Sequence, residues 1–102
     1  MTTLNITFNY EGQKRQLKAC LKNNMTISEN KQNQATPLIE DFGDEQRWSL
    51  YFADFDEEHD VEIVMLRDAE GNMTFEADYA IIWNKGGNID EEVDAQCRVK
   101  YS

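Results

Sequence analysis

The chain has 102 residues, of which 40% are apolar and 29% charged, and its 20 acidic residues outnumber ten basic ones. This length fits one domain, and the aromatic content suffices for a core, which excludes a large multidomain enzyme and a wholly disordered chain. The net charge of −10 argues against direct binding to nucleic acid or to an anionic membrane, and it favours basic partners or cations.

Apolar and polar residues alternate through the first 21 positions, as they do in half-buried strands. Every second residue from Leu4 to Tyr10 is apolar, and the pattern returns from Leu17 to Leu21. Glu11-Gly12 lies between these runs and supplies a tight turn, which predicts a hairpin. The polar stretch 28–37 predicts a mobile loop.

Alternation is clearer in the second half of the chain, where turn signals separate the apolar runs. The segment from Met73 to Trp83 alternates without a break and is the strongest predicted strand. No amphipathic helix and no internal repeat is visible. The pattern predicts one domain, residues 1–102, that folds as an all-β antiparallel sandwich or small barrel of six to seven strands built from hairpins. The strands expected in this half cover 47–55, 61–67, 73–83 and 93–101.

Charge is unevenly distributed along the chain. Residues 1–39 contain five bases and two acids, a net of +3, whereas residues 40–102 contain five bases and 18 acids, a net of −13. This asymmetry indicates a charged interaction face. Alternatively, the acidic loops only stay solvated and protect sheet edges from aggregation. The candidate partner-binding carboxylates are Asp54, Asp56, Glu57, Glu58 and Asp60, around a connection between strands, and Asp90, Glu91, Glu92 and Asp94, before the last strand.

The predicted turn at 68–72 fixes a register for the strands on either side of it. If Arg67 pairs with Met73, the apolar residues share one face, and Glu62 lies opposite Asp78 on the other. Two carboxylates directly across a ladder destabilise a free sheet. We therefore expect Glu62 and Asp78 to contact a cation or the Arg and Lys side chains of a partner.

Tyr51 and Phe55 belong to the predicted strand 47–55, which has apolar residues on both sides. The pattern fits a central strand covered on both faces, which places these rings in the core. It also fits an exposed aromatic patch beside the acidic loop, because aromatic anchors surrounded by charge are typical of interface hot spots. Both residues are therefore candidate partner-binding residues.

Metal and catalytic chemistry find little support in the sequence. His59 is the only histidine, and its flanking carboxylates should raise its pKa in a solvated loop. The alternating acids of 54–60 resemble the start of an EF-hand loop, but His59 stands where that loop needs Gly. Glycine-rich phosphate loops are absent. We expect no catalytic residues, no bound metal and no cofactor, although calcium held between loops stays open.

Cys20 and Cys97 are the only cysteines, and two distant cysteines do not form a paired zinc motif. We expect free thiols, with Cys97 as a small apolar filler, and keep a single disulfide as the alternative. The residues after Met1 do not resemble a secretory leader, and no apolar stretch approaches the roughly 20 residues of a membrane span. These features predict a cytoplasmic protein.

The leading functional hypothesis is a non-enzymatic acidic protein that inhibits a basic partner. Such a partner would be a toxin, a nuclease or another nucleic-acid enzyme, whose phosphate-binding surface the carboxylates would cover. Immunity proteins of toxin–antitoxin pairs and nucleic-acid mimics act in this way. The alternative is a calcium- or carbohydrate-binding β-sandwich module.

Overall fold

The computed structural model describes residues 1–22, 38–40 and 46–101, so the loop expected at 28–37 lies outside the described residues. The described residues form seven strands and no helix, which confirms the all-β prediction. These strands are β1 (Thr2–Tyr10), β2 (Gln13–Leu21), β3 (Leu38–Glu40), β4 (Arg47–Phe52), β5 (His59–Arg67), β6 (Met73–Asn84) and β7 (Ile89–Tyr101).

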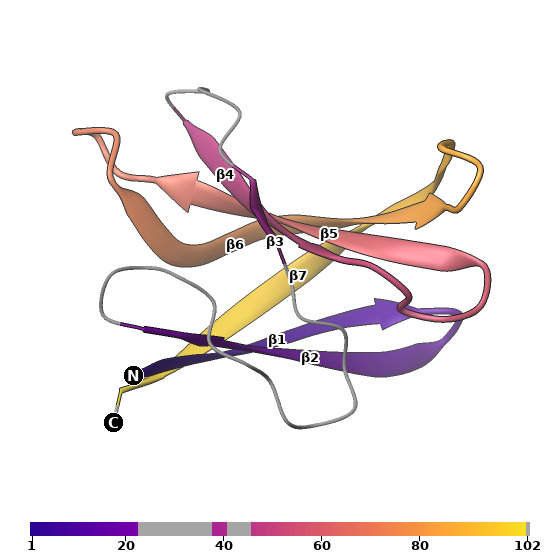
Figure 1. Ribbon diagram of the computed structural model, residues 1–102, viewed down its shortest axis with the longest axis horizontal. Helices are drawn as coiled ribbons and strands as arrows, with labels where there is room; N and C mark the ends of the chain where they lie inside the picture. Colours follow the sequence, from indigo (N-terminus) through magenta and orange to yellow (C-terminus); the bar gives the residue numbers. More distant parts are fainter. Residues whose placement is uncertain (23–37, 41–45, 102) are drawn as a thin grey trace.

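All seven strands belong to one antiparallel sheet with the order β2-β1-β7-β6-β5-β4-β3. The long strand β7 is shared: its first half pairs with β6 and its second half pairs with β1. The sheet therefore bends at β7, which crosses diagonally between the β1–β2 hairpin and the β3–β6 layer (Figure 1). The result is a curled half-barrel rather than two separate sheets.

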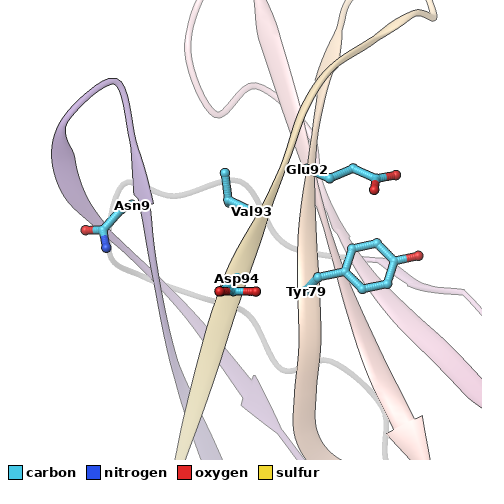
Figure 2. A pocket seen from close by; sticks show the side chains of 5 residues that line it. All are labelled: Asn9, Tyr79, Glu92, Val93 and Asp94. Atoms are coloured by element: carbon cyan, nitrogen blue, oxygen red, sulfur yellow. The ribbon is translucent and has the colours of Figure 1, made fainter.

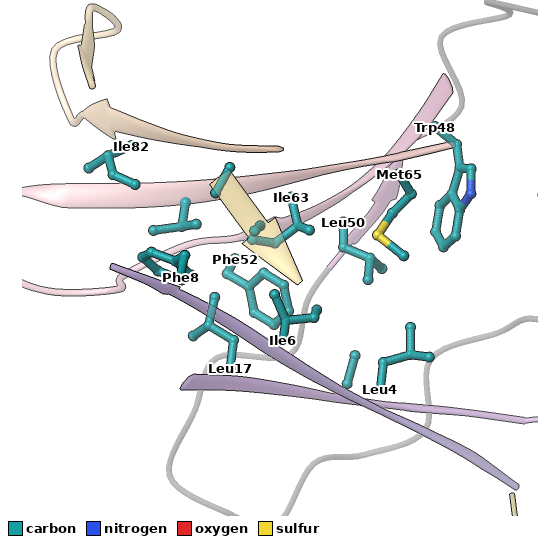
Figure 3. Packing of buried hydrophobic residues seen from close by; sticks show 14 of the residues in the cluster. Leu4, Ile6, Phe8, Leu17, Trp48, Leu50, Phe52, Ile63, Met65 and Ile82 are labelled. Atoms are coloured by element: carbon teal, nitrogen blue, oxygen red, sulfur yellow. The ribbon is translucent and has the colours of Figure 1, made fainter. Parts of the chain in front are cut away.

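The core fills the concave inner face of this half-barrel. Side chains from the β1–β2 hairpin point toward those of β4, β5 and β6 across the fold (Figure 3). Because side chains alternate between the faces of a strand, each apolar run of the sequence delivers every second residue to this core. The core residues are Leu4, Ile6, Phe8, Tyr10, Leu17, Ala19, Leu21, Trp48, Leu50, Phe52, Val61, Ile63, Met65, Ala80, Ile82 and Ala95.

The predicted register between β5 and β6 is wrong. Arg67 does pair with Met73, but two irregularities in the ladder shift the pairing, so that Glu62 lies opposite Ile81 and not Asp78. At these irregularities β6 contains more residues than the facing part of β5. Each extra residue shifts the alternation by one position, so side chains expected on one face of β6 lie on the other. Ala77 and Ala80 consequently both point toward the core. The side chains of Tyr79, Ile81 and Trp83 turn to the outer face.

Three strand boundaries also differ from the sequence expectations. β4 ends at Phe52 rather than at residue 55, and β5 begins at His59. β7 begins at Ile89, so the acidic residues 90–94 lie within the strand rather than before it. They are strand residues because the preceding turn returns the chain directly along β6, with Ile81 opposite Glu92. The outer face therefore carries carboxylates that were expected in a loop.

The two cysteines lie on different faces of the sheet. Cys97 packs against the core, where burial raises the pKa of its thiol to about 11, and this confirms its expected role as a filler. Cys20 lies between the buried residues Ala19 and Leu21 and so points to the outer face. Both are free thiols.

The turn between β1 and β2 offers a direct test of the fold. Glu11 and Gly12 have φ angles of 54° and 72°, the left-handed region that a two-residue type I′ hairpin turn requires. Asn tolerates this region better than Glu, so Glu11→Asn should raise the free energy of unfolding by about 0.5–1 kcal/mol. Thermal melting should show an increase of roughly 4 °C.

Glu11→Gln is the matched control for this turn. It removes the same carboxylate, which lies 3.6 Å from Arg15, but keeps an unfavourable residue at positive φ. The control should gain no stability. An equal gain in both variants would show that charge, and not backbone conformation, limits the turn.

Candidate functional site: an acidic and aromatic sheet face

Aromatic and acidic side chains gather on the outer face of the sheet, over β4 to β7. Two rows of directly paired residues cross these strands, one through Tyr51, Glu62, Ile81 and Glu92 and the other through Val64, Tyr79 and Asp94. Neighbouring side chains in such a row lie about 5 Å apart and can act together. We call this surface the acidic–aromatic face, made of Tyr51, Glu62, Val64, Tyr79, Ile81, Trp83, Glu92 and Asp94.

Glu62 lies at the centre of this face but is not available to a partner. Its side chain is buried, and both carboxylate oxygens accept hydrogen bonds. Ser49 Oγ donates to Oε2 at 2.8 Å, and Trp83 Nε1 donates to Oε1 at 3.0 Å. A buried charge is tolerated when its hydrogen bonds are satisfied in this way. Glu62 therefore holds β4 and β6 in position across β5.

Two carboxylates at the β4–β5 connection, Asp54 of the loop and Asp60 of β5, are also engaged within the protein. Asp60 accepts a 2.6 Å hydrogen bond from the Tyr51 hydroxyl, which lowers the pKa of Asp60 despite its partial burial. Burial together with this bond raises the pKa of Tyr51 to about 12. Lys85 of the β6–β7 turn forms ion pairs with Asp54 and Asp60. These contacts tie the acidic loop to the neighbouring turn.

His59 joins this loop to the β1–β2 hairpin. Its Nδ1 lies 2.8 Å from Asp56 Oδ1, and its Nε2 lies 3.3 Å from the Tyr10 hydroxyl, which donates to Asp90 at 2.5 Å. The hydrogen bond with Asp56 raises the pKa of His59, although burial opposes it, so the expected direction is confirmed. The expected solvated position is wrong, because only 12% of the side chain is exposed.

Phe55 and Asp78 also have partners inside the protein. The Phe55 ring is half-buried, with its centroid 5.7 Å from that of Phe8 and the Arg15 guanidinium 5.6 Å from its centre. Asp78 forms a 3.1 Å ion pair with Arg47. Phe55 thus packs onto the β1–β2 hairpin, and of the two candidate aromatic anchors only Tyr51 lies on the acidic–aromatic face.

The remaining candidate carboxylates are exposed and unengaged. Within the described part of the chain, no side-chain hydrogen bond or ion pair involves Glu57, Glu58, Glu91, Glu92 or Asp94. Of these, only Glu92 and Asp94 lie on the acidic–aromatic face, where Asp94 is directly opposite the half-buried Tyr79. Free carboxylates and partly exposed rings therefore meet at β6 and the first half of β7.

A groove runs along this part of the outer face. One cavity of about 520 Å³ is lined by Asn9, Tyr79, Glu92, Val93 and Asp94, and Figure 2 shows Asp94 between Asn9 and Tyr79. A second cavity of about 330 Å³ shares Asn9 and Asp94 and extends to Lys14 and Gln96. We call the two cavities together the β7 groove. It exists because the β1–β7 pairing ends at Phe8 and Ala95, beyond which the strands separate.

The opposite half of the sheet has the opposite charge. Apart from Cys20, the outward positions of β1, of β2 and of the second half of β7 are polar or cationic, and none of them is acidic. Positive and negative charges are therefore segregated on the outer surface, with the β7 groove at their boundary. The cationic residues of this half are Lys14, Lys18, Arg98 and Lys100.

Sequence reasoning missed the aromatic part of the site. Unbroken alternation from Met73 to Trp83 predicts that Tyr79 and Trp83 face the core, whereas the irregular β5–β6 ladder turns them outward. One signal was available: Val61 to Leu66 of β5 is apolar at every position but Glu62, so both faces of this strand had to be covered. The outward-facing residues of β6, which are Tyr79, Ile81 and Trp83, lie beside the outer face of β5 and help to cover it.

Comparison with models of known protein families finds no match, and comparisons with curated proteins and with solved structures find none either. Across residues 1–22, 38–40 and 46–101, no three His, Cys, Asp or Glu side chains converge closely enough to hold a metal ion. The same residues include no helix of the length and apolarity needed to cross a membrane. The arrangement on the outer face is thus the basis for a functional proposal.

Replacing Glu62 tests its role at the centre of the face. Glu62→Ala leaves the Trp83 indole N–H and the Ser49 hydroxyl without their acceptor, and should lower the free energy of unfolding by about 2–3 kcal/mol. Glu62→Gln keeps a partner for both groups and should cost less than about 1 kcal/mol. Urea unfolding measures both values, and equal losses would contradict this account.

The His59 contacts predict a pH-dependent stability. Because the folded pKa lies above the ordinary value of 6.5, the stabilisation from protonated His59 is complete below pH 6.5 and disappears as the pH rises through the folded pKa. Urea unfolding should show this alkaline loss in the native protein and not in His59→Gln. The single histidine also allows direct titration by NMR, and a pKa at or below 6.5 would refute the prediction.

Proposed function

We propose that this chain is a non-enzymatic acidic protein that binds and inhibits a basic partner by covering its functional surface. A toxin, a nuclease or another nucleic-acid enzyme has the chemistry that fits, because the carboxylates would occupy the positions of substrate phosphates. The chain would then act as an immunity protein or a nucleic-acid mimic. A cytoplasmic location is part of this proposal.

The observation that carries this proposal is the meeting of unengaged carboxylates with partly exposed aromatic rings. Glu92 and Asp94 have no partner in the described part of the chain and lie beside Tyr79 on a hydrogen-bonded sheet. Aromatic anchors of this kind contribute most of the affinity at interfaces, while charge accelerates encounter and selects the partner. A preformed sheet also loses little conformational entropy on binding.

The segregation of charge determines which half of the surface a basic partner approaches. The carboxylates lie on and around β4 to β7, whereas the outward face of the β1–β2 hairpin carries lysines. A basic partner approaching the protein is therefore drawn to the acidic half and repelled from the other. The internal pairs of Asp54, Asp56 and Asp60 shape the end of this half, and their role is to hold the loops.

A carbohydrate-binding module is the second candidate. The β7 groove combines a tyrosine ring with amide and carboxylate side chains, and these are groups that can stack on a sugar and bind its hydroxyls. The calcium alternative has no comparable observation among the described residues. The two remaining candidates differ in salt dependence, because only charge pairing with a basic protein weakens strongly as ionic strength rises.

Capture from native lysate at about 50 mM and about 500 mM NaCl tests the proposal. We expect a basic protein to be retained at low salt and released at high salt, and its purified form to bind with a measurable Kd. The double variant Glu92→Gln, Asp94→Asn should weaken this binding at least about tenfold, which corresponds to 1.4 kcal/mol.

The double variant Glu70→Gln, Glu76→Gln is the matched control, because it removes the same charge from exposed positions outside the acidic–aromatic face. It should leave the affinity nearly unchanged. Equal weakening by both double variants would show that the affinity depends only on the net charge of the protein and not on the position of its carboxylates. Retention of no protein at either salt concentration would refute the proposed function.

A further inference from the structure

We propose that the β7 groove is a binding site for a single arginine side chain, with the guanidinium stacked on the Tyr79 ring and held at its edge by Asp94 and Glu92. This inference rests on the proposed function and deepens it, because it names the group by which the partner is anchored. It is drawn from the cavity, from the charge of its walls and from the separation of β1 and β7.

The geometry of β7 favours one cation between two carboxylates. Glu92 and Asp94 are two positions apart on the same face of a strand, so their side chains emerge about 6.6 Å from each other. Figure 2 shows Glu92 extending in the same direction as Tyr79, with Asp94 between Tyr79 and Asn9. Both carboxylates are exposed and have no partner in the described part of the chain. Their mutual repulsion is relieved when a cation binds between them.

The aromatic wall favours arginine over lysine. Tyr79 is half-buried and lies directly across the ladder from Asp94, so a cation bound to Asp94 is within reach of the ring. A guanidinium is planar, stacks on an aromatic face and still donates N–H groups from its edge to two carboxylates. An ammonium group is more strongly hydrated and lacks this fork. The amide of Asn9 supplies a further acceptor on the opposite wall.

The cavity at the Lys14 end of the groove limits which residues of the partner can lie next to the bound arginine. Lys14 and Gln96 line the adjoining cavity, which shares Asn9 and Asp94 with the first. A second cation at this end would be repelled by Lys14, whereas a neutral or acidic residue would be accepted. The site therefore fits an isolated arginine beside a neutral or acidic residue, and not a run of basic residues.

NMR titration of the ¹⁵N-labelled protein tests the site directly, because the chain is small enough for every amide to be followed. The probes are N-acetyl-arginine amide, N-acetyl-lysine amide and the neutral isostere N-acetyl-citrulline amide. We expect saturable shifts at Asn9, Tyr79 and residues 92–96 with arginine, in the millimolar range for so small a ligand. Lysine should bind at least fivefold more weakly, and citrulline should cause no saturable shift.

Variants separate the groove from general acidity. Asp94→Asn and Tyr79→Ala should each weaken arginine binding at least fivefold, whereas Tyr79→Phe keeps the ring and should retain it. Glu91→Gln is the matched control, because Glu91 is an exposed carboxylate of the same strand that does not line the groove. Unchanged spectra away from the groove confirm that each variant is folded. Equal weakening by Glu91→Gln would overturn the assignment.

The remaining outcomes distinguish this inference from the proposed function. A separate titration with tri-N-acetylglucosamine serves as the sugar probe. Equal shifts with citrulline, shifts spread over all carboxylates, or groove shifts caused only by this sugar would each overturn the arginine site. If basic-protein capture still depends on Glu92 and Asp94 in that case, the proposed function stands without it. Arginine binding in the groove without capture of any basic protein would leave the site standing and refute the proposed function.

Discussion

The change of pairing partner along β7 is the constraint on which the rest of this structure depends. One strand holds β6 with its first half and β1 with its second, so the sheet must bend where the partners change. The bend encloses the core on one side and separates β1 from β7 on the other, beyond Phe8 and Ala95. The same hydrogen-bonding pattern thus creates both the interior of the protein and its principal outer groove.

Local patterns were sufficient to predict six of the seven described strands, but neither β3 nor the register between β5 and β6. The first hairpin and its turn at Glu11-Gly12 follow from alternation and backbone preference, which are properties of neighbouring residues. The β5–β6 register depends on irregularities that satisfy packing on two faces at once, and alternation in one strand does not encode them. The Glu62–Asp78 pair was lost for this reason, and Tyr79 and Trp83 reached the outer face.

Acidic composition alone could not separate binding carboxylates from structural ones. Asp60, Glu62 and Asp78 were all candidates by charge, yet each accepts a hydrogen bond from a side chain on another strand. The sequence does not reveal that these carboxylates are acceptors, because their donors come close only in the folded chain. The residues opposite Glu92 and Asp94 on β6 are Ile81, which carries no side-chain donor, and Tyr79, whose hydroxyl forms no hydrogen bond with either carboxylate.

The pairing of Thr2 with Tyr101 places the first and last strands edge to edge (Figure 1). A few linking residues would close the backbone into a ring, and the chain could then be reopened at the 84–88 turn while every ladder is kept. Both ends also lie about 23 Å along β7 from Asp94, at 3.3 Å per residue. Grafting this protein into a surface loop of a carrier would accordingly leave its acidic half facing outward.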